Sequence, residues 1–116
     1  MNDVDEDRLL AAITVERGRV EDQIANLEQN FIGIIDAAEL TSTDDEHDPE
    51  GTTIAYERAQ ASALLDQARK DLIALDATVD RIDDGTADTC AVCGGTIAVE
   101  RLLALPEVST CIDCAS

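Results

Sequence analysis

Residues 90–114, CAVCGGTIAVERLLALPEVSTCIDC, contain two pairs of cysteines, and each pair has two residues between its thiols. This spacing lets both thiols of a pair reach one tetrahedral ion, and the glycines after the first pair allow a tight turn whose N–H groups point at sulfur. Four thiolates close the coordination shell of zinc, so we predict one structural zinc ion per chain. A pair of redox-active C-x-x-C motifs is the alternative. The predicted ligands are Cys90, Cys93, Cys111 and Cys114.

A short helix is expected between the two cysteine pairs. Apolar side chains recur at helical spacing from Ile97 to Leu105, and Pro106 ends the run. We expect the apolar side of this helix to pack against the base of the preceding helices.

Upstream of the cysteines, two stretches carry apolar residues in alternating steps of three and four, the spacing of a heptad stripe. In an antiparallel hairpin, facing residues have numbers of nearly constant sum; Ile13 and Ile82 sum to 95, and the other facing pairs sum to 95 or 96. The predicted fold is therefore mostly α: a long antiparallel coiled coil over residues 1–85, then a small four-cysteine zinc finger over residues 86–116. The stripes comprise Leu10, Ile13, Val20, Ile24, Leu27, Phe31, Ile34 and Ala38, and then Ile54, Ala61, Leu65, Ala68, Leu72, Leu75, Val79 and Ile82.

Residues 41–53, TSTDDEHDPEGTT, separate the two stripes and contain no apolar side chain. Because Pro49 and Gly51 break a helix, this segment is predicted to be the loop at the tip of the hairpin. Asp48 followed by Pro49 also suits the N-cap and first turn of the second helix. The loop has no Lys or Arg, and its acidic residues are the candidate partner-binding residues Asp44, Asp45, Glu46, Asp48 and Glu50.

Composition limits the function further. The chain has 26 Asp or Glu and 8 Lys or Arg, a formal net charge of −18, whereas nucleic-acid binding draws its affinity from cationic side chains. Direct binding of DNA or RNA is therefore not expected. The acidic N-terminus lacks the features of a secretory signal, and no apolar run approaches the roughly 18 residues that span a bilayer, so we expect a cytoplasmic protein without a membrane partner. An enzyme is not expected, because His47 is the sole histidine and has no Cys or Ser near it in the sequence.

The acidic hairpin tip, the two cysteine pairs and the Ile-x3-Arg-Leu-x-Ala-x-Pro segment between them resemble the DksA/TraR family of bacterial transcription regulators over residues 44–115. The resemblance implies that the hairpin enters the secondary channel of RNA polymerase, that acidic tip residues act near the catalytic metal ion, and that the zinc finger is a structural base. The family's tip pattern Asp-x-x-Asp-x-Ala aligns with residues 45–50, where Glu50 stands in place of the Ala. The matching finger residues are Cys90, Cys93, Gly94, Ile97, Arg101, Leu102, Ala104, Pro106, Cys111 and Cys114.

Binding of the nucleotide ppGpp is not predicted. Family members that respond to ppGpp have basic residues just before the Pro and just after the last Cys, and here Leu105 and Ala115 occupy these positions. Two other functions remain open: a zinc-stabilised module that binds another protein, and a thiol redox sensor in which oxidation ejects zinc. Tyr56, beside the tip, and Arg101 are possible partner contacts.

Overall fold

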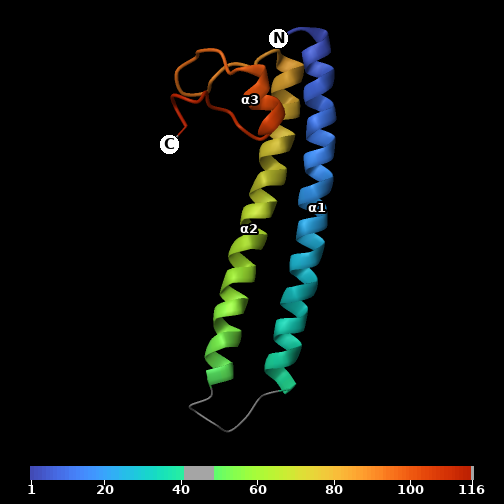
Figure 1. Cartoon of the computed structure of the whole chain (residues 1–116), viewed down its shortest axis with the longest axis vertical. Helices are drawn as coiled ribbons and strands as arrows, with labels where there is room; N and C mark the ends of the chain where they lie inside the picture. Colours follow the sequence, from blue (N-terminus) through green and yellow to red (C-terminus); the bar gives the residue numbers. More distant parts are fainter. Residues whose placement is uncertain (41–48, 116) are drawn as a thin grey trace. The chain divides into compact units, whose positions relative to one another are not determined.

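The computed structural model describes residues 1–40 and 49–115, and the side chains of residues 1–33 and 52–115. This part of the chain contains three helices, α1 (Asp3–Leu40), α2 (Pro49–Asp84) and α3 (Val99–Ala104) (Figure 1). No strand occurs within it, and one isolated bridge pairs Thr89 with Thr96. The mostly α fold class is therefore confirmed, including the short helix between the cysteine pairs. In the described ranges, no helix is long and apolar enough to cross a membrane.

The first compact unit contains residues 1–20 and 71–116, which comprise the start of α1, the end of α2 and the cysteine-rich segment. Its core combines the fully buried Leu9 and Leu75 of the long helices with Ile97 and Leu102 of the segment between the cysteine pairs. The apolar side of α3 thus packs on the long helices, as expected from its sequence. The start of α1 and the end of α2 therefore belong to the same compact unit as the finger. The division of the chain into a coiled coil over residues 1–85 and a zinc finger over residues 86–116 stays a prediction.

The core of this unit differs from the sequence expectation by one residue in α1. Leu9 has no exposed surface, whereas 39% of Leu10 is exposed. Positions 9 and 10 lie four and three residues before Ile13, so both satisfy the heptad spacing. The buried cluster that includes Ile97 and Leu102 contains Leu9 and not Leu10. The prediction that Leu10 faces the core was therefore wrong.

Helix α2 ends in a Schellman motif that turns the chain toward the first cysteine pair. Gly85 has φ of +76°, its N–H donates to Ile82 O at 3.1 Å, and the Thr86 N–H donates to Arg81 O at 2.8 Å. A residue with a Cβ disfavours this left-handed conformation, which is why glycine ends the helix here.

The second compact unit contains residues 21–70. Its buried side chains are Ala61, Leu65 and Ala68. Its parts of α1 and α2 are in contact with each other: Arg69 Nη2 lies 3.4 Å from Glu28 Oε1, and the Arg58 guanidinium lies 5.9 Å from the centre of the Phe31 ring. Residue numbers rise along α1 as their partners fall along α2, so the two stretches are antiparallel.

The second long helix begins inside the segment that was predicted to be the tip loop, residues 41–53. Since α2 starts at Pro49, residues 49–53, which the sequence analysis placed in the tip loop, are helical. Proline suits a first helical turn, because its φ is already helical and its missing N–H would have no partner there. The alternative interpretation of Pro49 as the first-turn residue of the second helix is thus confirmed, whereas Asp48 lies outside the described residues.

Candidate metal centre

The first cysteine pair lies on a turn closed by backbone hydrogen bonds. The Gly94 N–H donates to Cys90 O at 3.0 Å, and the Cys90 N–H donates to Gly95 O at 2.8 Å. Gly94 has φ of +74°, which glycine adopts without strain. The Gly95 N–H donates to Cys93 Sγ at 3.3 Å. The two glycines therefore make the turn and direct an N–H group at sulfur, as their position in the sequence suggested.

The second cysteine pair forms a similar turn. The Cys114 and Ala115 N–H groups donate to Cys111 O at 3.1 and 3.0 Å. The Ala91 N–H donates to Ser109 O at 2.8 Å, which joins the first turn to the chain leading into the second. The two cysteine pairs are thereby held face to face.

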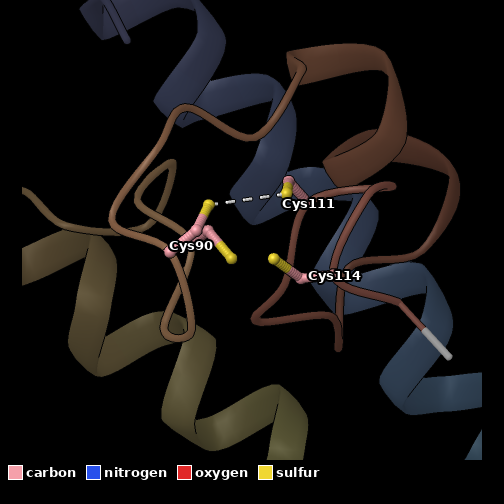
Figure 2. A group of neighbouring side chains, drawn as sticks. Cys90, Cys111 and Cys114 are labelled. Carbon is pink, nitrogen blue, oxygen red and sulfur yellow. Dashed lines mark hydrogen bonds between the residues drawn. The ribbon is translucent and has the colours of Figure 1, made fainter.

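The four sulfur atoms have the spacing that zinc requires. Cys93 Sγ and Cys111 Sγ lie 3.7 Å apart, and all four Sγ atoms lie within 4.8 Å of one another. Figure 2 shows Cys90, Cys111 and Cys114 gathered around one small volume. Ligands about 2.3 Å from a tetrahedral zinc ion lie about 3.8 Å from each other, so the observed separations fit a four-cysteine zinc site. Such a site is closed to water and substrate, and its zinc is structural.

The local environment shifts the pKa values of two of the four thiols in opposite directions. Backbone N–H groups, first of Cys93 and then of Cys111, lower the pKa of the Cys90 thiol to about 6. The neighbouring thiols, first of Cys111 and then of Cys93, raise the pKa of the Cys114 thiol to about 12. Four crowded sulfurs cannot all carry negative charge unless a positive ion neutralises them, and a coordinated thiol is deprotonated outright. The donor set therefore suits a divalent metal ion.

Of the other predicted site residues, the structure describes the side chains of Arg101 and Tyr56. Arg101 Nε donates to Thr110 O at 3.0 Å, which gives this side chain a contact inside the finger. Tyr56 is 69% exposed on α2. The acidic residues of the predicted tip lie outside the residues whose side chains the structure describes: Asp44, Asp45, Glu46, Asp48 and Glu50.

Two polar residues of α2 contact the finger, and the sequence did not indicate either contact. Thr78 Oγ1 donates to Pro106 O at 2.8 Å, and Arg81 Nη2 donates to Val108 O at 3.0 Å. Thr78 adjoins the apolar stripe and is completely buried. Its position beside the stripe could have indicated that it is buried. The carbonyl group that accepts its hydrogen bond could not be predicted, because it depends on the path of the chain after α3.

Comparison with known proteins adds to this geometry. The prokaryotic dksA/traR C4-type zinc finger matches residues 85–116. No curated protein sequence matches the chain. Among solved structures, that of transcription factor DksA2 from Pseudomonas aeruginosa is similar with a TM-score of 0.76 and 21% identity, over 97% of this chain and 81% of that one. At this identity the likeness shows the fold. The chain thus carries, over residues 85–116, a structural zinc finger of the prokaryotic dksA/traR C4 type.

Proposed function

We propose that this protein is a transcription regulator that acts by binding RNA polymerase. The observation that carries the proposal is the combination of a dksA/traR-type finger with a fold that matches a transcription factor over 97% of the chain. The net charge of −18 favours contact with a protein rather than with DNA or RNA, because an acidic chain has few cations to neutralise phosphates. Such a regulator would act in the cytoplasm, and the closed shell of four thiolates suits a scaffold rather than a catalyst.

In this proposal the hairpin enters the secondary channel, and its acidic tip lies near the polymerase active site. The support is compositional: residues 41–53 carry five acidic residues and no Lys or Arg. The exposed Tyr56, close to this segment in α2, is a candidate contact with the channel wall. The tip residues would approach a cationic or metal-containing surface, where carboxylates gain the most electrostatic energy.

The decisive experiment separates binding from action. Purified protein is tested for binding to RNA polymerase and for its effect on transcription, with the Asp45→Asn/Asp48→Asn double variant beside it. The variant should bind and lose the effect, because the finger and helices are unchanged while the tip charge is reduced. Asp7→Asn/Asp80→Asn is the matched control, since it removes the same charge from exposed positions of α1 and α2. Failure of the unaltered protein to bind polymerase would overturn the proposal and favour a module for another protein partner.

Regulation without ppGpp belongs to the same proposal. Leu105 borders a hollow of about 610 Å³ on the finger, together with the apolar Ala98, Ala104 and Ile112. Arg101 also borders it, but its Nε is engaged with a backbone carbonyl. This surface offers little charge to several phosphates, so addition of ppGpp should leave polymerase binding unchanged.

A second candidate function is a thiol redox sensor, which one observation favours: Cys93 is exposed and its sulfur lies 3.7 Å from that of Cys111. Hydrogen peroxide would oxidise two thiolates to a disulfide, with two protons taken up, two waters formed and zinc released. The test follows zinc release while peroxide is titrated. Release only at concentrations far above those in cells would contradict this function.

A further inference from the structure

Three carbonyl groups of the five-residue segment 106–110, which leads into Cys111, accept hydrogen bonds from side chains of α2 and α3. We call the three donor residues the clamp. The pairs are Thr78 Oγ1 to Pro106 O at 2.8 Å, Arg81 Nη2 to Val108 O at 3.0 Å, and Arg101 Nε to Thr110 O at 3.0 Å. A fourth bond within the clamp runs from Arg81 Nη2 to Thr78 Oγ1 at 3.0 Å. The clamp and the segment thus form one network.

Burial of an apolar helix face does not require these polar residues. Thr78 has no exposed surface, and an aliphatic side chain of similar volume would need no hydrogen-bond partner. Arg81 Nε is buried and has no partner within the described residues, which costs free energy. The contacts made by Arg81 Nη2 offset part of this cost. The Thr78 hydroxyl lies 3.1 Å from Ala74 O of its own helix and 2.8 Å from Pro106 O, and the shorter distance favours donation to Pro106 O. The polar residues on this face of α2 are therefore explained by the carbonyl groups of segment 106–110 to which they donate.

The clamp acts close to the metal ligands. Thr110 O belongs to the same planar peptide unit as the Cα atom of Cys111, so a bond to this oxygen orients the start of the second cysteine pair. The same segment is tied to the first pair by the bond from the Ala91 N–H to Ser109 O. It is thereby held by α2, by α3 and by the first cysteine pair together.

We infer that Thr78, Arg81 and Arg101 are positioning residues for zinc. By fixing segment 106–110 they place Cys111 and Cys114 opposite the first cysteine pair, and they make retention of zinc depend on the last turns of α2. The dependence is reciprocal, because whatever α2 contributes to zinc affinity, zinc contributes to the stability of α2. Partners that orient metal ligands typically change metal affinity tenfold to a hundredfold when removed. The inference concerns zinc alone and stands apart from the proposed polymerase contact.

The test measures the rate at which zinc passes from the full-length, zinc-loaded protein to an excess of a chromophoric chelator. Thr78→Val, Arg81→Gln and Arg101→Gln should each release zinc about tenfold to a hundredfold faster than the unaltered protein. Two control variants should match the unaltered protein. Thr14→Val removes a hydroxyl that donates only to a carbonyl of its own helix, Leu10 O, and Arg69→Gln removes an arginine paired with Glu28 in the other compact unit.

Two further measurements separate positioning from general loss of structure. Thr78→Ser keeps the hydroxyl and should restore slow release, so the Ser and Val variants decide the matter even if Arg81→Gln does not fold. After zinc removal, the backbone amides of the last turns of α2, residues 78–84, should lose protection from hydrogen exchange. The amides of residues 61–70 should stay protected. Zinc release at control rates in all three clamp variants, or an equal loss of protection along α2, would overturn the inference.

Discussion

Gly95 is the position at which one added methyl group should weaken zinc binding. An alanine Cβ there would lie 3.2 Å from Cys93 Sγ, closer than ordinary van der Waals contact, while the backbone itself imposes no left-handed conformation. The sulfur must move by a few tenths of an ångström, and zinc sites tolerate about 0.2 Å in ligand distance. The shift also disturbs the bond from the Gly95 N–H to this sulfur. The expected loss is about tenfold to a hundredfold in zinc affinity, or about 1.4 to 2.8 kcal/mol.

The assay is competition for zinc with a chelator of known affinity, at a pH where the unaltered protein is fully loaded. Gly18→Ala is the control, because nothing lies within 4 Å of a Cβ at that exposed position in α1. It should leave zinc affinity unchanged and stabilise the helix by about 0.5 to 1 kcal/mol. Equal zinc affinity in Gly95→Ala and the unaltered protein would refute the argument that this turn is closed around Cys93 Sγ.

Three other changes test the fold and the metal centre. Leu9→Ala should cost about 2 to 5 kcal/mol in urea unfolding because Leu9 is fully buried, and Leu10→Ala should cost far less; similar costs would contradict the packing of α1. Gly85→Ala should cost about 1 to 2 kcal/mol in the same measurement, through the strain of a Cβ at φ of +76°, and an unchanged stability would contradict the helix end described here. Zinc affinity should fall as pH falls, because protons compete with the metal for thiolates. The pKa of the Cys90 thiol is lowered to about 6, so this thiol becomes protonated only below that pH. Below pH 6 zinc must therefore displace one more proton, and zinc affinity should fall more steeply with pH. Chelator competition above and below pH 6 measures the two slopes.

The features predicted from the sequence are those that depend on short spacings. The two residues between the thiols of each pair predict a shared metal ion, and the heptad steps predict two long helices. Both predictions depend on neighbours within one or two turns. The prediction of Leu10 was wrong because Leu9 belongs to a buried cluster that includes Ile97 and Leu102, which lie far along the chain beyond both long helices. Membership of such a cluster is set by the path of the chain, which the local spacing does not contain.

The roles of polar residues were harder to predict for a related reason. Arg101 stays a predicted partner contact, and the bond from its Nε to Thr110 O within the finger was not indicated by the sequence. Thr78 lies beside the apolar stripe rather than in it, so the heptad spacing does not predict its burial. Carbonyl acceptors are carried by every residue, so a sequence does not show which of them a distant hydroxyl or guanidinium will meet.

The two compact units differ in what stabilises them, and this difference bears on the proposed function. The unit with the finger buries large side chains such as Leu75 and Ile97 and has the zinc site. The unit of residues 21–70 buries mainly alanine among its described side chains, which removes little apolar area from water, and its exposed Glu28–Arg69 pair adds under about 1 kcal/mol.

Large apolar side chains are exposed in both units, but in the second unit Ile32, Tyr56 and Leu64 are exposed while few large side chains are buried among those described. A partner that covers them would supply stabilisation that the unit lacks by itself, because buried apolar area is worth about 25 cal/mol per Å². Binding of RNA polymerase should therefore slow hydrogen exchange in residues 52–70 much more than in residues 71–84. Equal or greater slowing in residues 71–84 would mean that the polymerase contact is not concentrated on the second unit, and would contradict entry of the hairpin into the channel.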